Sequence, residues 1–101
     1  MADNTLKPKR KTGTKTARPR LHKVLLHNDD FTPRNFVVRV LKAVFRTTED
    51  EAVRIMLTAH MKGMSVVAVF TREIAEQKAT EATDMAREEG YPLMFSTEPE
   101  E

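Results

Sequence analysis

The residues best suited to chemistry in this chain form a short polar stretch, Asn28-Asp29-Asp30, directly after an apolar run. Their amide and carboxylate oxygens accept hydrogen bonds, so together they could hold a cationic group. Thr32 and Pro33 follow and are typical of an N-cap and a first helical position, which predicts that the acceptors lie at a strand-to-helix corner. The alternative is an ordinary turn, in which Asn and Asp side chains bond only to their own backbone.

A histidine further along the chain could supply another acceptor. His60 falls on the same helical face as Met56 and Val53, four and seven positions earlier, so a ring nitrogen would lie beside an apolar wall. Combined with the polar loop, this arrangement favours a ligand that joins a protonated amine to an apolar side chain. The alternative is a histidine whose hydrogen bonds are satisfied within the core.

Metal binding and hydrolysis are poorly supported by the residue types. His22, His27, His60 and the two aspartates lack a metal-ligand spacing such as His-Glu-x-x-His. No serine stands in a glycine-flanked elbow, and the chain contains no cysteine. We therefore expect no metal, no cofactor and no catalytic residue. A small hydrolase that uses His60 is the enzymatic alternative.

The charge of the chain divides into two regions of opposite sign. Residues 1–20 hold seven of the 17 lysines and arginines but only one of the 15 acidic residues. Large apolar side chains are scarce there, so we expect a disordered basic N-terminal arm followed by a core domain over 21–101. Because acids outnumber bases in that core, no nucleic-acid partner is expected. A nucleic-acid- or ribosome-associated protein that acts through the arm is the alternative function.

Length and composition also limit the kind of protein. The 101 residues allow one domain with a modest core, so a shallow surface site is expected. No segment is apolar enough to span a membrane, and the lack of cysteine is compatible with a reducing cytoplasm. We expect a cytoplasmic monomer without a membrane partner.

Hydrophobic periodicity predicts helices and strands along the core. Apolar pairs recur every four residues from Phe36 to Phe45, as in a helix with one broad buried stripe. Thr48 and Glu51 have the spacing of a capping box, and Gly63 can end the helix that they begin. The run from 64 to 70 is nearly all apolar and is expected to be the middle strand of the sheet.

The complete set of predicted elements defines a fold class. Their order, β-α-α-β-α-β, predicts an α/β (α+β) fold, a two-layer sandwich with a three-stranded sheet and three helices on one side. The elements are a strand over 21–27, a helix from 33 to about 46, a helix from 48 to 63, a strand over 64–70, a helix from 71 to about 89 with Ile74, Ala75, Ala79, Ala82, Met85 and Ala86 on its buried side, and a short strand over 93–95.

Four blocks of the sequence, in order and with compatible gaps, together resemble the ClpS family. They are VLLHNDDFTP at 24–33, MLTAH at 56–60, FTREIAEQK at 70–78 and GYPL at 90–93, and the resemblance extends over nearly all of residues 21–97. It implies a non-catalytic adaptor that binds N-end-rule substrates by their first residue. The adaptor would deliver them to the N-domain of a ClpA-type AAA+ unfoldase of a Clp protease, with the arm assisting delivery.

The resemblance also implies roles for individual residues. By position, the contacts to a substrate's α-amino group fall on Asn28, Asp29 and His60, and the unfoldase-docking residues are Glu73 and Lys78. The implied pocket for the first side chain consists of Asp30, Thr32, Arg34, Val37, Met56, Leu57, Ala59 and Leu93.

Two of these positions depart from the family's usual pattern. Arg34 stands where ClpS pockets commonly carry an apolar residue, often Met, and Ala59 stands where a bulkier Val is common. A roomier wall leaves unfilled volume around a small side chain. Among first residues Phe, Tyr, Trp and Leu, we therefore expect the aromatic ones to bind more tightly than Leu.

Overall fold

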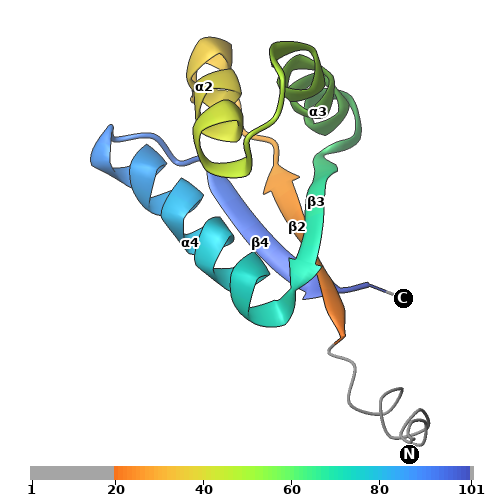
Figure 1. The fold of residues 1–101 in the computed structure, drawn as a ribbon. Coiled ribbons are helices and arrows are strands. Elements are labelled where there is room, and N and C mark those ends of the chain that lie inside the picture. The colour runs from red at the N-terminus through yellow and green to blue at the C-terminus, as the bar shows by residue number, and fades with distance from the viewer. Residues whose placement is uncertain (1–19, 101) are drawn as a thin grey trace, which may run out of the picture.

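A computed structural model describes residues 20–100 of the chain. A three-stranded antiparallel sheet forms one layer and three helices form the other (Figure 1). The elements run β2 (Leu21–His27), α2 (Arg34–Phe45), α3 (Glu49–Lys62), β3 (Met64–Thr71), α4 (Arg72–Glu88) and β4 (Met94–Pro99). The predicted order and two-layer class are confirmed. The proposed arm over 1–20 lies, apart from Arg20, outside the described residues.

Strand β2, not β3, is the centre of the sheet. The strand order is β3-β2-β4, and β2 pairs antiparallel with both neighbours. Val24, Leu25 and Leu26 are buried, whereas Val66 and Val69 of β3 are 49% and 37% exposed. The expectation of a middle strand over 64–70 is therefore wrong. A continuous apolar run is also compatible with an edge strand whose outer face is left uncovered.

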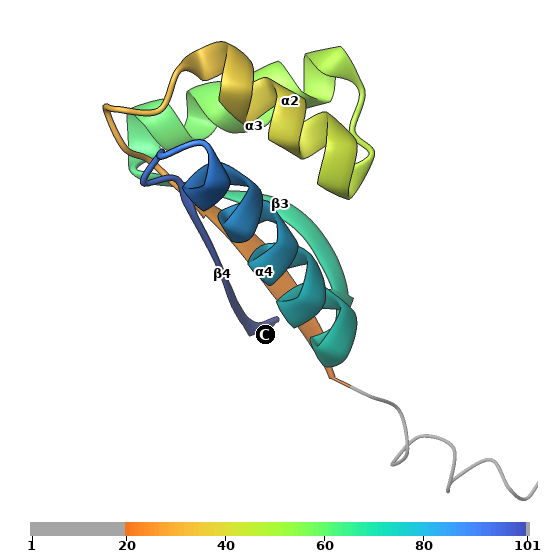
Figure 2. The ribbon, with the colours of Figure 1, turned by 90° about the vertical axis from the view of Figure 1, so that its left-hand side faces the viewer.

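The core lies between the sheet and the three helices. Val24 and Leu26, two residues apart on β2, belong to the same buried cluster as the apolar side chains of α2, α3 and α4. Leu25 points to the opposite face and is not part of that cluster. The helices thus cover one face of the sheet, with α4 lying along the strands and α2 and α3 near the end where β2 stops (Figure 2).

The predicted buried stripe of α2 is confirmed, but its predicted cap is wrong. All six apolar residues of the pairs between Phe36 and Phe45 are buried. The helix begins at Arg34 with Pro33 at the N-cap position, and no side chain caps it. Thr32 lies before the helix, where its backbone and hydroxyl bond to Asp29. The Thr32 hydroxyl donates to the Asp29 carboxylate inside the loop and does not accept a hydrogen bond from the first turn of the helix.

The other two helices follow the sequence signals more closely. Thr48 and Glu51 form both bonds of the capping box, and Gly63 ends α3 with a positive φ of 91°. On α4 the four alanines at 75, 79, 82 and 86 are buried, and Met85 packs partly against the core. Ile74 was also expected on the buried side of α4, but it is 41% exposed, so that expectation was wrong. The buried stripe begins at the next residue, Ala75. Strand β4 is longer than predicted and continues to Pro99.

None of the helices in the described part of the chain is long and apolar enough to cross a membrane.

Candidate functional site

The polar stretch at 28–33 connects the end of the central strand to the start of α2. The backbone N–H of Asn28 donates to the carbonyl of Gly63 at 3.0 Å, which ties the loop to the turn between α3 and β3. The loop therefore has three anchors: a buried strand, a helix and this hydrogen bond. Such fixed attachment keeps its side chains in a defined position relative to α3.

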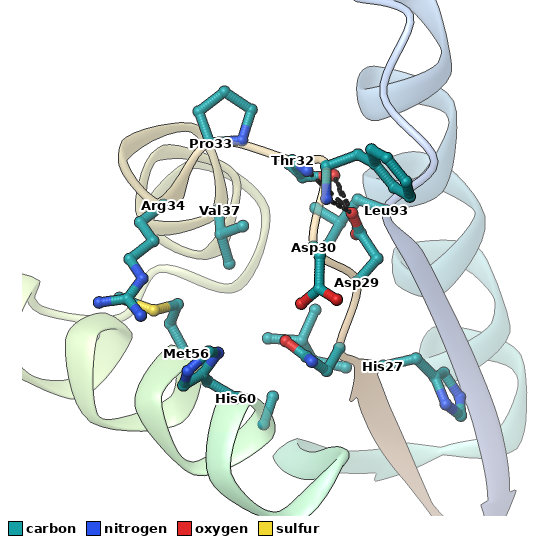
Figure 3. A pocket seen from close by; sticks show the side chains of 14 residues that line it. His27, Asp29, Asp30, Thr32, Pro33, Arg34, Val37, Met56, His60 and Leu93 are labelled. Atoms are coloured by element: carbon teal, nitrogen blue, oxygen red, sulfur yellow. Dashed lines mark hydrogen bonds between the residues drawn. The ribbon is translucent and has the colours of Figure 1, made fainter.

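A pocket of about 340 Å³ lies between this loop, α2, α3 and the start of β4 (Figure 3). Its volume is within the range of small-ligand sites. The lining residues are Leu26, His27, Asn28, Asp29, Asp30, Phe31, Thr32, Pro33, Arg34, Val37, Met56, Ala59, His60 and Leu93.

Asp29 organises the loop through its carboxylate. One oxygen, Oδ1, accepts from the backbone N–H groups of Phe31 and Thr32, both at 2.8 Å, and from the Thr32 hydroxyl at 3.0 Å. The second oxygen, Oδ2, lies 2.9 Å from the same hydroxyl. This is the local turn bonding that the sequence offered as the alternative to a ligand site. Most of the acceptor capacity of Asp29 is thus already used inside the protein.

Asp30 has the opposite arrangement. Figure 3 shows its carboxylate pointing into the pocket, whereas the Asp29 carboxylate turns back toward Thr32. Within residues 20–100, the side chains of Asp30, Asn28 and His60 make no hydrogen bond to protein. All three residues are exposed to solvent. Three unused acceptors of different chemical types therefore line one pocket.

The apolar part of the pocket comes from three elements. Val37 of α2, Ala59 of α3 and Leu93 before β4 are buried, and Met56 of α3 is half-buried. Because Ala59 has only a methyl side chain, α3 extends less far into the pocket at that point than it would with a larger residue. The pocket can accept an apolar group of substantial size while the polar loop contacts a neighbouring charged group.

The structure brings together nearly all the residues that the sequence placed in the site. Leu57 is the exception, because it is 39% exposed on α3 and does not line the pocket. Four lining residues were not singled out as pocket residues: Leu26, His27, Phe31 and Pro33. Phe31 is 80% exposed, and an aromatic residue within a polar loop was a signal that could have identified it.

The two residues assigned to unfoldase docking differ in their environments. Lys78 is half-buried, donates from Nζ to the carbonyl of Val44 at 3.0 Å and lies 5.8 Å from the centre of the Phe70 ring. Glu73 is exposed in the first turn of α4. That turn follows Thr71, which pairs with Leu21 at the end of the sheet remote from the polar loop (Figure 1).

Among residues 20–100, no group of three or more His, Asp or Glu side chains lies close enough together to hold a metal ion. His22 and His27 lie near opposite ends of the same strand, and His27 Nε2 is 2.6 Å from the Ser96 hydroxyl.

Comparison with known proteins identifies the family of this chain. The family model for the ATP-dependent Clp protease adaptor protein ClpS matches residues 17–96. The chain belongs to the ClpS family. ClpS proteins are adaptors of a Clp protease and form a non-catalytic family.

Individual ClpS relatives match most or all of the chain. The adapter protein ClpS 1 of Bradyrhizobium diazoefficiens is 62% identical over 101 residues, all of both chains. A ClpS of Deinococcus radiodurans is 52% identical over 87 residues, 86% of this chain and 77% of the relative. The structure of Agrobacterium tumefaciens ClpS2 bound to L-phenylalaninamide superimposes on this fold with a TM-score of 0.81. The match covers 82% of this chain and 100% of the ClpS2 chain, with 63% sequence identity.

Proposed function

We propose that this ClpS protein captures polypeptides by their free α-amino group and large first side chain, and delivers them to a ClpA-type unfoldase for degradation. The observation that carries this proposal is the pocket itself, in which three unused acceptors stand beside an apolar hollow. An α-ammonium group donates three hydrogen bonds. The amide oxygen of Asn28, the carboxylate of Asp30 and a neutral ring nitrogen of His60 supply three acceptors of the required kind.

The contribution of Asp29 to amine capture is indirect in this proposal. Its carboxylate holds Phe31 and Thr32 and so fixes the backbone that presents Asp30. Oδ2, which has one protein partner, can still reach the amine through a water molecule. We therefore assign the direct carboxylate contact to Asp30, although the family resemblance placed an α-amino contact at Asp29.

The proposed preference for aromatic first residues rests on the shape of the apolar wall. Ala59 leaves more room than a larger residue would, and a small ligand side chain leaves part of that room unfilled. The related Agrobacterium ClpS2 binds L-phenylalaninamide, a ligand with a free amine and an aromatic side chain. That ligand chemistry supports both halves of the proposed recognition.

Delivery requires a second surface. We propose that the unfoldase N-domain docks on α4 at Glu73 and Lys78, remote from the peptide pocket, so that both partners can bind at once. The ammonium of Lys78 is partly committed to the Val44 carbonyl, which leaves Glu73 as the more accessible of the two charges. A cytoplasmic location and a monomeric state stay predictions.

A fluorescence-anisotropy panel tests the capture step. Short labelled peptides that differ only in the first residue (Phe, Tyr, Trp, Leu or Ser) are titrated with their N-termini free and acetylated. We expect acetylation to weaken binding of Phe-first peptides by about 100-fold, because the acceptors that the bound peptide covers lose their donors, and we expect Phe to bind more tightly than Leu. Equal binding of free and acetylated peptides would overturn the proposal.

The delivery step needs its own assay. Degradation of a Phe-first fluorescent protein by a ClpA-type unfoldase with its peptidase is followed with and without the adaptor. We expect stimulation that depends on the adaptor and is lost when the substrate begins with Ser. Normal peptide capture without any stimulated degradation would contradict the delivery role alone.

A further inference from the structure

Arg34 is the cation of the peptide pocket, and within residues 20–100 its guanidinium makes no hydrogen bond or ion pair. It is the first residue of α2 and lies three positions before Val37, so both side chains project from the same helical face. Figure 3 shows the arginine extending from α2 toward the side of the pocket formed by Met56. The charged end of Arg34 thus lies beside the apolar wall.

Ion pairing does not explain this position. The first turn of α2 contains no acidic residue, and the side chains three and four positions after Arg34 are Val37 and Val38. Asp30 lines the same pocket but is not within ion-pair distance of Arg34. The amine of a bound polypeptide is itself a cation and would be repelled. An attractive partner that the proposed ligand would bring to this guanidinium is the face of its aromatic ring.

Arginine suits that interaction better than lysine does, because its planar guanidinium is weakly hydrated and stacks on aromatic faces. The protein already contains one such contact on the same helix, where the Arg39 guanidinium carbon lies 5.3 Å from the centre of the Phe36 ring. A ring bound against Val37 and Met56 would lie in the same pocket as the Arg34 guanidinium, within reach of a similar contact.

We propose that Arg34 recognises aromatic first residues by a cation–π contact, in addition to the size selection made by the apolar wall. This inference rests on the proposed capture of N-terminal residues and adds a specificity-determining residue to it. It makes a prediction that size selection does not make. For two ligands whose first side chains have similar size, the aromatic one should bind more tightly because it has a π-system. Removing the π-system without removing the bulk should weaken binding.

Cyclohexylalanine provides that comparison, because it is similar in size to Phe, more apolar and not aromatic. Apolar transfer alone favours cyclohexylalanine. A cation–π contact at a partly exposed site favours Phe by about two- to five-fold, and by more when the contact is desolvated. The informative quantity is the ratio of the two affinities, because replacing Arg34 also removes a general repulsion that affects every ligand amine equally.

The experiment measures binding of Phe-first and cyclohexylalanine-first peptides, each with free and acetylated ends, to the wild type and to Arg34→Gln, Arg34→Met and Arg39→Gln. We expect the Phe preference to fall by about two- to five-fold in both Arg34 variants. It should be unchanged in Arg39→Gln, the control on the same helix outside the pocket. Thermal unfolding of each variant establishes that the exposed substitution leaves the fold intact.

The possible failures are distinguishable. If binding requires the free amine but the Phe to cyclohexylalanine ratio is the same with and without Arg34, this inference is overturned and the proposed capture function stands. If acetylation has no effect on any peptide, the capture function fails and the role of Arg34 fails with it.

Discussion

Replacement of Asp29 separates the roles of the two neighbouring carboxylates. In Asp29→Ala, the N–H of Phe31 and both the N–H and the hydroxyl of Thr32 lose their acceptor. Phe31 is exposed and can bond to water instead, whereas Thr32 is only 8% exposed. At about 1 kcal/mol for each of the two Thr32 donors, the expected loss of unfolding free energy is about 2 kcal/mol.

That loss corresponds to a melting temperature lower by about 10 °C for a domain of this size. Asp29→Asn is the matched control, because its amide oxygen can still accept from both backbone N–H groups, and Asn and Asp are nearly equivalent in such roles. We expect Asp29→Asn to be destabilised by less than about 0.5 kcal/mol and to bind Phe-first peptides within about three-fold of the wild type.

Asp30→Asn should behave in the opposite way. Among residues 20–100 its carboxylate has no hydrogen-bond or ion-pair partner, so stability should not change, while loss of a charged acceptor for the amine should weaken peptide binding by about ten-fold or more. Urea unfolding and peptide anisotropy measure the two properties on the same samples. Ten-fold weaker binding in Asp29→Asn, with wild-type binding in Asp30→Asn, would show that the amine contacts the other carboxylate.

Further predictions concern the remaining parts of the site and the core. His60→Ala should weaken binding of Phe-first peptides in the anisotropy panel, because the ligand amine loses one of its acceptors. Ala59→Val should reduce the Phe to Leu affinity ratio by about three-fold or more in the peptide panel, because the added methyl groups narrow the pocket. Glu73→Lys should abolish stimulated degradation without changing peptide affinity, as measured by the two assays in parallel. Leu41 is fully buried, so Leu41→Ala should lower the free energy of unfolding, measured with urea, by about 2–5 kcal/mol.

Helical periodicity and the capping box of α3 were reliable guides to the fold, whereas the capping signal at Thr32 and Pro33 was not. The apolar pairs of α2 and the Thr48–Glu51 capping box are local features, and the structure contains both as predicted. Strand order could not be obtained in the same way. Whether an apolar strand is central or at an edge depends on partners far along the chain, and here the edge strand β3 is more continuously apolar than the central strand β2.

The residues of the site could be predicted from the sequence, but the separate roles of the two aspartates could not. Residue types and the family resemblance identified Asn28, Asp29, Asp30 and His60, and the structure places all four around one pocket. Which aspartate is free depends on loop geometry. The turn directs the Asp29 carboxylate onto the donors of Phe31 and Thr32, and no pattern in the sequence distinguishes it from its neighbour.

Because the polar loop is attached to the central strand, ligand binding in the pocket is coupled to the stability of the whole domain against unfolding. Strand β2 is bonded on both sides, so its end is expected to move freely only when the sheet comes apart. A ligand that binds only the intact pocket therefore opposes global unfolding, by about 2.7 kcal/mol when its concentration is 100 times its dissociation constant. A client-loaded adaptor would consequently withstand heat and proteolysis longer than an empty one.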